Sequence, residues 1–350
     1  MTTRSKRPTL STVAEKCGYS VNTVSRALRG DDRLPEATIQ KIRQAADEVG
    51  YIPNVLASSL RSSDTHTIAI IIEDIENPHY SHLMSRIDLE LRARGYSVII
   101  LCNNKSLTSE HQLAALSISY NVDGVLLFPQ TSSNSSSGSL SAVRLLQRNH
   151  IPYVLVDRSI LMHDTDCVRV DDEEGGYLAG KILSEMGHRK FLYIMGPENN
   201  SSQILRQKGL LRAIDEYCGS GTSNKNIRFM NESVYLTAQE QGNLYYLLTP
   251  LDYTALVCFN DECAYYCMQA LQVNGCRIPE DVSLIGFDSI ATDSRFLPKL
   301  SSIAHKRGHS LAKVTVEAIM KRIKNPAGDY GNVILPVDYY DGGTCGRPRK

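Results

Sequence analysis

Residues 9–30 read TLSTVAEKCGYSVNTVSRALRG, two short amphipathic segments separated by a turn. Thr9 can cap a first helix, whose apolar side chains recur every three or four residues, and Gly18 can end it in left-handed backbone. Ser20 can cap a second helix over residues 21–29. Two short helices joined by so tight a turn predict a helix-turn-helix motif.

The second predicted helix has two chemically different faces. At about 100° per residue, Val24 and Ala27 fall on an apolar side, whereas Asn22 and Arg26 lie one turn apart on a polar side. Asparagine can form paired hydrogen bonds with an adenine edge, and arginine can do so with guanine. We therefore expect Asn22 and Arg26 to contact bases, with Val21 near a thymine methyl group. An ordinary surface helix would show the same pattern, so the helix pair alone does not decide.

A third predicted helix, residues 36–49, completes a small apolar core and ends at Gly50. Residues 51–61 follow and read YIPNVLASSLR, a weak helical pattern that predicts a linker able to fold on contact. We therefore expect an all-α helix-turn-helix head over residues 1–53 and a hinge helix or linker over residues 54–65.

The head and linker follow a pattern of residue types that extends beyond the helix pair. It comprises Thr9-Leu10, Val13-Ala14-Glu15-Lys16, Gly18, Ser20, Thr23-Val24-Ser25-Arg26, Gly50-Tyr51-Ile52-Pro53-Asn54, Ala57 and Leu60.

This pattern resembles the head and hinge of the lactose-repressor (LacI/GalR) family of bacterial transcription regulators. In that family the second helix enters the major groove, and the hinge helices of two subunits pair in the minor groove and kink the DNA. The resemblance implies that Leu60 is the side chain wedged between base pairs. Pro35 departs from the pattern, because the family usually has serine or aspartate as the cap of the third helix.

The charge of the 350-residue chain is unevenly distributed, although its 38 basic and 38 acidic residues cancel. Residues 1–62 carry ten basic and six acidic side chains, and the remainder has the opposite excess. A local positive excess suits a module that contacts phosphates. We expect a double-stranded DNA operator as partner. The predicted DNA-contacting residues are Thr9, Ser20, Val21, Asn22, Thr23, Ser25, Arg26, Arg29, Tyr51, Asn54, Ala57 and Leu60.

From Thr67 onward, short apolar segments alternate with longer amphipathic ones, a rhythm that predicts βαβ units and a parallel sheet. The pattern restarts at Cys167, which predicts two successive half-domains. The family resemblance extends here through motifs such as Gly286-Phe287-Asp288. It implies an α/β body of periplasmic-binding-protein type, made of two Rossmann-like subdomains around an effector cleft.

The resemblance further implies that the chain crosses between these subdomains three times, near Val170, His305 and Ile334. The last helix, residues 310–323, would then return to the N-terminal subdomain. We expect an effector-binding and dimerisation domain whose N-subdomain comprises residues 66–168 and 306–332, and whose C-subdomain comprises residues 169–304 and 333–350.

Polar residues at the ends of the predicted strands are candidates for ligand binding, because ligands of open α/β sheets bind beyond the strands' carboxyl ends. Carboxylates, an amide and a guanidinium can bond adjacent hydroxyl groups, which favours a carbohydrate effector. The alternative is that Asp157 and Asp288 cap helices and that Arg206 forms a surface ion pair. By position, the resemblance places effector contacts at Tyr80, Asp157, Arg206, Asn260, Asp288 and His305, with Tyr235 or Leu236 near an aromatic wall.

Sequence motifs of enzymes and metal sites are absent: there is no GxxxxGK[ST], GxSxG or HExxH. The acidic residues 171–174 lack the spacing of a calcium loop and predict a charged helix start. Cys263 and Cys267 lie one turn apart beside Met268, which favours core side chains over metal ligands. We predict a protein that is not an enzyme, with no cofactor and no metal.

The expected function is that of a transcription repressor that binds a palindromic operator as a homodimer, under control of a small-molecule effector. No run of about 18 apolar residues is present, and no apolar segment follows the basic residues 1–7, so we expect a cytoplasmic protein without a membrane partner. No leucine heptads follow Asp341, so a dimer is expected rather than a coiled-coil tetramer. A protein corepressor or a non-sugar ligand is an alternative controller, and a sugar-processing enzyme with a DNA-binding head is a further alternative.

Overall fold

The computed structural model describes residues 8–29, 31, 33–52, 65–103, 109–130, 138–160, 164–219, 221, 223–290 and 297–349. The chain divides into two compact units at Thr65 and His66, a small head and a large body, and each is described by itself. Within the described residues, no helix is long and apolar enough to cross a lipid bilayer.

The head consists of three helices, α1 (Leu10–Cys17), α2 (Val21–Leu28) and α3 (Glu36–Val49). The predicted caps are confirmed: the Thr9 hydroxyl accepts a hydrogen bond from the Thr12 amide, and the Ser20 hydroxyl accepts one from the Thr23 amide. Apolar side chains from all three helices form one core, with Val13, Val24, Ala27 and Ile42 fully buried.

The end of α2 and the start of α3 differ from those of an ideally capped helix or from the predicted bounds. Helix α2 ends at Leu28, with Arg29 as its cap, one residue earlier than predicted. Pro35 precedes α3 and makes no side-chain capping bond, so α3 begins without the polar cap that α1 and α2 have. Glu36 in the first turn of α3 favours the helix electrostatically.

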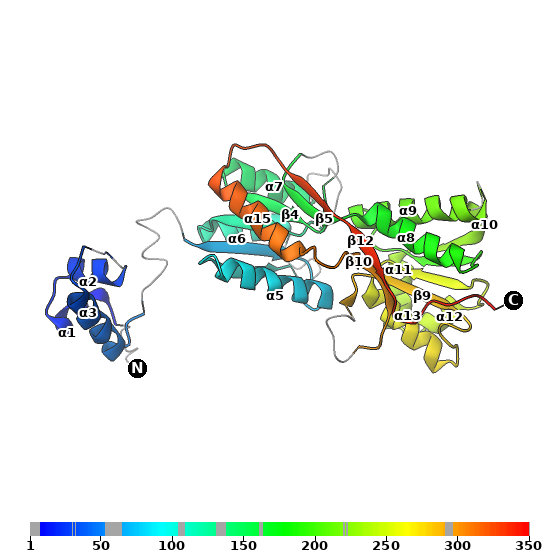
Figure 1. Cartoon of the computed structure of the whole chain (residues 1–350), viewed down its shortest axis with the longest axis horizontal. Helices are drawn as coiled ribbons and strands as arrows, with labels where there is room; N and C mark the ends of the chain where they lie inside the picture. Colours follow the sequence, from blue (N-terminus) through cyan, green and yellow to red (C-terminus); the bar gives the residue numbers. More distant parts are fainter. Residues whose placement is uncertain are drawn as a thin grey trace. The chain divides into compact units, whose positions relative to one another are not determined.

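The first half of the body is a six-stranded parallel sheet covered on both faces by helices. Its two apolar cores involve α5 (Pro78–Arg92) and α15 (Leu311–Lys324) on one face, and α6 (Glu110–Ser119) and α7 (Ser139–Arg148) on the other. Figure 1 shows α15 beside α5. The strand order is β11 (Asn332–Leu335), β5 (Cys167–Val170), β4 (Tyr153–Val156), β3 (Gly124–Leu127), β1 (Thr67–Ile72) and β2 (Ser97–Cys102).

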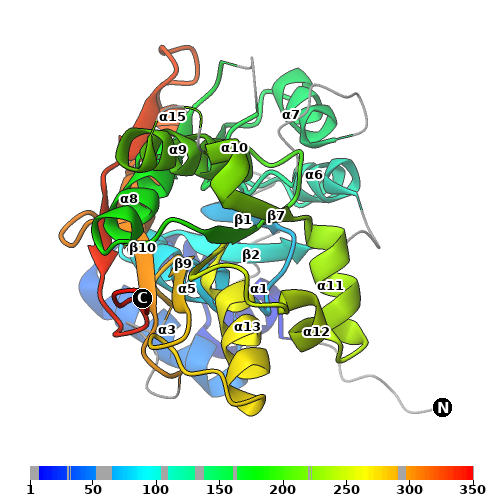
Figure 2. The ribbon, with the colours of Figure 1, turned by 90° about the vertical axis from the view of Figure 1, so that its right-hand side faces the viewer.

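The second half repeats this arrangement around a six-stranded sheet in which only β12 runs antiparallel among the described strands. Figure 2 shows α8 (Asp172–Glu185) and α9 (Ser201–Cys218) together on one side of the sheet, and α11 (Glu232–Glu240), α12 (Leu244–Leu248) and α13 (Asp261–Val273) on the other. Helix α10 (Ser223–Asn226) follows α9. The strand order is β12 (Val337–Tyr340), β10 (Ser301–His305), β9 (Ser283–Phe287), β8 (Ala255–Cys258), β6 (Phe191–Ile194) and β7 (Ile227–Met230).

The chain passes between the halves after β5, after β10 and between β11 and β12. Helix α15 packs in the first half, where the sequence placed it. The prediction that the strand at Cys167 opens the second half is wrong, because β5 pairs with β4 and β11 in the first sheet. The predicted boundaries at residues 168 and 332 therefore cut strands that the structure keeps whole. The crossings lie after Val170, His305 and Leu335, where the resemblance implied them to within a residue.

Candidate nucleic-acid interface and ligand cleft

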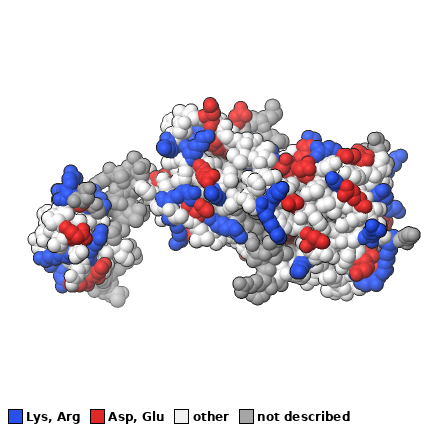
Figure 3. Space-filling model, in the orientation of Figure 1, with Lys and Arg blue, Asp and Glu red and all other residues white. Residues whose placement is uncertain are grey.

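Helix α2 keeps a polar face available outside the head core. Val21 and Asn22 are exposed, Ser25 and Arg26 are partly exposed, and Val24 and Ala27 on the opposite side are buried. On the face drawn in Figure 3, basic side chains mark several parts of the head, with fewer acidic ones between them. Both the exposed amide and the positive charge are what a helix that reads DNA needs.

Asp31 holds Arg26, the candidate base-reading arginine. Arg26 Nε donates to Asp31 Oδ2 at 2.8 Å, and Arg33 donates to the same carboxylate through Nε and Nη2. These hydrogen bonds from Arg33 and Arg26 keep the pKa of Asp31 well below its usual range. Sequence reasoning missed this orienting contact, whose only signal is an acidic residue shortly after the helix.

The other predicted DNA contacts lie in different settings. Thr9 and Ser20 are exposed residues that cap α1 and α2. The hydroxyl groups of Thr23 and Ser20 form a hydrogen bond with each other. Arg29 is exposed, and Tyr51 is partly buried against the head core. The predicted hinge contacts lie outside the described residues: Asn54, Ala57 and Leu60.

One polar cluster of the body forms where the start of α5 meets the end of β4. Tyr80 Oη donates to Asp157 Oδ2 at 3.1 Å, and Arg158 Nη2 donates to Tyr80 Oη at 2.6 Å. His79 Nε2 lies 3.8 Å from Asp157 Oδ1. Asp157 has φ 69°, a left-handed backbone that turns its side chain at the strand end.

The electrostatics of this cluster favour a charged pair. Burial opposes protonation of His79, but the charge of Asp288 and the contact with Asp157 outweigh it and raise the pKa of His79 to about 9. Although burial also opposes ionisation of Asp157, His79 and Arg158 hold its pKa well below the usual range. An imidazolium and a carboxylate therefore coexist here at neutral pH.

Raising the pH should weaken the body through His79. Because its folded pKa of about 9 exceeds the ordinary value of 6.5, its contribution is present in full below pH 6.5 and is lost as the pH rises through 9. Urea unfolding measured at several pH values between these limits should show stability falling more steeply in wild type than in His79→Gln. Parallel pH profiles of the two proteins would exclude His79 as the source.

A second polar cluster surrounds Arg206, which is buried between aromatic rings. Its Nε donates to Asp172 Oδ1 at 2.8 Å, its Nη1 donates to the Phe259 carbonyl at 2.6 Å, and its Nη2 lies 3.5 Å from Asp288 Oδ1. The guanidinium also lies 5.1 Å from the Phe259 ring centre and 4.5 Å from that of Phe287. Burial alone would lower the pKa of Arg206, but the charges of Asp172 and Asp288 raise it. Arg206 therefore forms a buried ion pair, and the alternative that it pairs at the surface is wrong.

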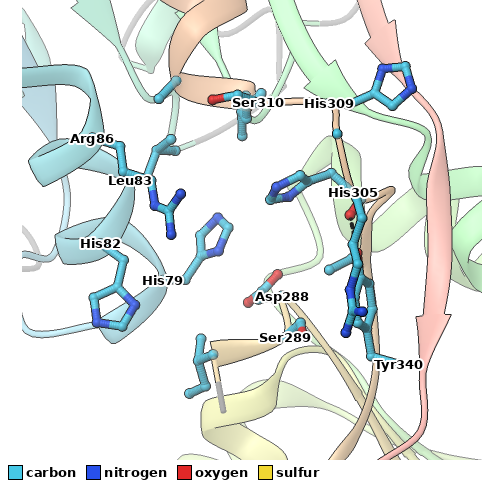
Figure 4. Close-up of a pocket in the computed structure, with 16 residues that line it drawn as sticks. His79, His82, Leu83, Arg86, Asp288, Ser289, His305, His309, Ser310 and Tyr340 are labelled. Carbon is cyan, nitrogen blue, oxygen red and sulfur yellow. Dashed lines mark hydrogen bonds between the residues drawn. The ribbon is translucent and has the colours of Figure 1, made fainter. Parts of the chain in front are cut away.

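The two clusters meet at a pair of cavities between the two halves of the body. The smaller cavity, about 20 Å³, is lined by residues of both clusters, among them Asp157, Asp172 and Arg206. The larger, about 320 Å³, lies next to it, because His79, Asp288 and His305 line both. Figure 4 shows these three residues around the larger cavity. A molecule bound here would contact α5 of the first half and the ends of β9 and β10 of the second.

The structure brings together five of the eight predicted effector contacts: Tyr80, Asp157, Arg206, Asp288 and His305. Asn260 caps α13 by accepting a hydrogen bond from the Cys263 amide at 2.9 Å. Tyr235 is buried in a core cluster on the α11–α13 side of the second sheet, and Leu236 is exposed. These three line neither cavity.

Three further residues belong to the site although they were not among the eight predicted effector contacts: His79, Arg158 and Asp172. Asp172 was interpreted as part of a charged helix start, and Asp171 does cap α8. The Asp172 side chain is nevertheless buried and bonds Arg206. The sequence shows that Arg158 follows a strand and that a histidine precedes Tyr80. It does not show which side chains these two residues contact.

A group of potential metal ligands lies away from the cleft. The sulfur atoms of Cys258, Cys263 and Cys267 lie within 4.8 Å of one another, and all three residues are buried. They belong to the same apolar core as Met268 and Leu271. Three thiols could hold a soft metal ion, but packing in this core accounts for them without one.

Comparisons with known proteins agree with both parts of the chain. Residues 9–54 match the model for bacterial regulatory proteins of the lacI family, and residues 65–341 match that for periplasmic binding proteins and the sugar binding domain of the LacI family. The repressor PurR of Vibrio atlanticus (strain LGP32) is 30% identical over 91% of this chain and 92% of its own length. The regulator DegA of Bacillus subtilis (strain 168) is 29% identical over 85% of this chain and 86% of its own.

Solved structures show the same architecture. The lac repressor dimer bound to operator and the anti-inducer ONPF matches 97% of this chain and all of its own, with a TM-score of 0.79 and 21% identity, which shows the fold alone. A regulator from Enterococcus faecium with bound ribose matches 81% of this chain and all of its own, with a TM-score of 0.68 and 27% identity. The regulator CelR in complex with cellobiose matches 97% of this chain and all of its own, with a TM-score of 0.66 and 23% identity.

Proposed function

The chain belongs to the LacI family of bacterial transcription regulators, and we propose that it represses transcription as a homodimer bound to a palindromic operator. It is a DNA-binding regulator with a ligand-binding domain and not an enzyme, as the sequence predicted. We place it in the cytoplasm, where its operator lies.

The observation that carries the DNA-binding proposal is the pair of capped helices α1 and α2 with an exposed polar face on α2. In helix-turn-helix proteins the second helix lies in the major groove, and dimers bind two half-sites related by symmetry. Asn22 and Arg26 supply the amide and the guanidinium that read bases. Asp31 fixes the Arg26 guanidinium before DNA arrives, so less side-chain freedom is lost on binding.

The controlling ligand is proposed to be a small molecule in the cleft, and a carbohydrate is the best supported class. Support comes from the polar clusters around Asp157 and Arg206 and from relatives of the same fold with ribose and cellobiose bound. A ligand touching both halves would favour one arrangement of the subdomains over another. Such a preference couples effector binding to DNA affinity in both directions.

Arg26→Ala should reduce the preference for one base pair of the operator, because that base pair would lose the two hydrogen bonds that the guanidinium donates. We expect discrimination at that position to fall by about 1–3 kcal/mol. Duplexes selected from a random pool by wild type and by the variant would be sequenced, and their affinities measured by fluorescence anisotropy. The matched control is Arg43→Ala, which removes the same charge from an exposed position on α3.

The control should weaken binding little and keep the wild-type consensus. A variant at Arg26 that selects the same consensus as wild type would contradict the assignment of this residue to a base. A wild-type consensus without two symmetric half-sites would contradict the proposed dimer on a palindromic operator.

A further inference from the structure

The segment that follows α2 folds back on the end of the helix and places a carboxylate beside Arg26. The Asp31 amide donates to the Arg26 carbonyl at 3.2 Å, and the Leu34 amide donates to the Asp31 carbonyl at 3.2 Å. The Arg33 amide donates to the Asp31 side chain, at 3.1 Å from Oδ1. Three hydrogen bonds from backbone amides therefore fix both the turn and its carboxylate.

This one carboxylate binds two guanidinium groups. Arg26 Nε donates to Asp31 Oδ2 at 2.8 Å. Arg33 donates through Nε to Oδ1 at 2.9 Å and through Nη2 to Oδ2 at 3.0 Å. The Asp31 side chain is only 13% exposed, whereas those of Arg26 and Arg33 are 37% and 78% exposed. A carboxylate placed in this way acts through the arginines rather than by contacting a base itself.

The contact with Asp31 decides which edge of the Arg26 guanidinium can face a base. A guanidinium donates through Nε, Nη1 and Nη2 in a fixed, planar fork. Asp31 occupies Nε, and within the described part of the chain Nη1 and Nη2 of Arg26 have no hydrogen-bond partner. Two parallel donors at the end of the side chain match guanine, whose O6 and N7 atoms are both acceptors in the major groove. Adenine presents one acceptor and one donor there and would satisfy only half of the pair.

The charge of the same cluster opposes binding to DNA of arbitrary sequence. Asp31 leaves one net positive charge where Arg26 and Arg33 alone would supply two. The hydrogen bonds from Arg33 and Arg26 hold the pKa of Asp31 well below its usual range, so the carboxylate keeps its charge at neutral pH. Non-specific binding depends on the attraction of cations to phosphates, which repel a carboxylate. Asp31 therefore weakens the sequence-independent part of the interaction.

We infer that Asp31 is a specificity-determining residue, which positions Arg26 so that Nη1 and Nη2 bond O6 and N7 of one guanine in each half-site. Asp31 does not touch the base, so it is a positioning residue. The inference rests on the proposed function, and it names the base that Arg26 reads and the residue that enforces this choice. Loss of Asp31 should change affinity and specificity in opposite directions. DNA of arbitrary sequence would be bound more tightly, and the guanine would be preferred less.

The test compares DNA binding by the full-length wild-type protein and by Asp31→Ala. The operator would be selected from a random pool with wild type, and all four base pairs would then be placed at the position where Arg26→Ala loses its preference. Fluorescence anisotropy at several salt concentrations measures each affinity. Asp31→Ala should lower the preference for G·C at that position about two- to tenfold, because binding must now order a side chain that was held in place. Affinity for a duplex of unrelated sequence should rise about two- to fivefold at low salt.

Two control variants separate the positioning of Arg26 from a change of charge and from a looser turn. Asp47→Ala removes the same charge from an exposed position on α3 and should leave the preference for G·C unchanged. Arg33→Gln removes the charged donors of Arg33 but keeps the bond from Arg26 to Asp31. It should weaken binding to all duplexes alike and also leave the preference unchanged.

A conservative variant keeps the test valid if the alanine substitution disturbs the head. Asp31→Asn retains an acceptor oxygen in the same place without the charge, so its preference for G·C should lie between those of wild type and Asp31→Ala. A gain in affinity for the unrelated duplex would show that the head of either variant is folded, because an unfolded head would lose affinity. If Asp31→Ala bound no DNA, Asp31→Asn would decide the question alone.

Four results would overturn the inference. An unchanged preference in the Asp31 variants would show that Arg26 needs no positioning, and a stronger preference would show that Asp31 competes with the base. An equal loss in Asp31→Ala and Arg33→Gln would assign the effect to the turn as a whole. A wild-type consensus with a base other than guanine opposite Arg26 would contradict the proposed geometry.

These results remain distinct from a failure of the proposed function. Wild type that selects a symmetric operator, combined with Asp31 variants that keep its full preference, would contradict the inference alone. Wild type that selects no DNA sequence would contradict the proposed function, and the inference with it.

Discussion

Replacing Arg206 by alanine is expected to lower the free energy of unfolding of the body by about 3–5 kcal/mol. Arg206 is 5% exposed, and Asp172 is 2% exposed. Removing the guanidinium would leave the Asp172 carboxylate buried without its partner and would take a hydrogen bond from the Phe259 carbonyl. Urea unfolding followed by circular dichroism measures the loss.

The matched control is Arg212→Ala on the same helix. Its side chain is 49% exposed and pairs with Glu173 and Glu174 at the surface, an arrangement that contributes about 0–1 kcal/mol. Arg206→Lys keeps the charge but not the forked donor, so its stability should fall between those of wild type and Arg206→Ala. Equal stability of the Arg206→Ala and Arg212→Ala proteins would show that the buried cluster does not stabilise the fold.

A large loss of stability changes how Arg206 variants are interpreted. From sequence, Arg206 was expected to contact a ligand at the strand ends. The structure adds two carboxylates, a carbonyl and two aromatic rings around the same guanidinium. A variant that fails to respond to a ligand must therefore be shown to be folded before its defect is assigned to binding.

The head could be predicted almost completely because its signals are local. Thr9 and Ser20 cap the helices they precede, and Gly18 adopts φ 77° at the end of α1. Helical periodicity alone assigned Val24 and Ala27 to the core. Each of these features is decided within about one helical turn of the residue concerned.

The subdomain boundaries could not be predicted to the residue because they depend on partners far along the chain. The strand at Cys167 is short and has no local mark of the sheet it joins. It joins the first sheet by pairing with β4 on one side and with β11, which begins at Asn332, on the other. The apolar pattern alone does not show these pairings, whereas the family resemblance implied a crossing near Val170, where β5 ends.

The sequence predicted which strand ends form the cleft, but it did not predict which side chains there pair with one another. Asp157 and Asp288 could be found because each follows an apolar strand, and both have left-handed backbone there. The contacts of Asp172 with Arg206 and of Asp31 with Arg26 were not found. In each case the acidic residue looked like a solvated charge at a helix end, and only the tertiary structure shows the arginine beside it.

Helices α8 and α9 touch backbone to backbone, which makes two glycines irreplaceable. A Cβ atom on Gly176 would lie 1.9 Å from the Arg206 carbonyl oxygen, and one on Gly209 would lie 1.9 Å from that of Glu173. Both distances are far shorter than a non-bonded contact between carbon and oxygen can be. The close approach also brings Asp172, the first residue of α8, within bonding distance of Arg206 on α9.

Gly176→Ala should therefore lower the free energy of unfolding by about 3 kcal/mol, the upper end of what overpacking costs. This holds although alanine favours a helix over glycine by about 1 kcal/mol. Because the clash is with the backbone of Arg206, relief requires the helices to separate. The bond from Arg206 to Asp172 should lengthen, so that the response to ligand weakens as well as the fold. Thermal and urea unfolding and ligand titration would be measured on the same preparation.

The adjacent glycine provides the control. A Cβ on Gly175 would lie 3.3 Å from an Ile303 methyl carbon and 3.4 Å from the Phe287 ring, and these side chains can shift by a few tenths of an ångström. Gly175→Ala should remain within about 1 kcal/mol of wild type, because the gain in helix propensity offsets the tighter packing. If the two variants proved equally stable, the backbone contact of α8 with α9 would not be what positions Asp172 against Arg206.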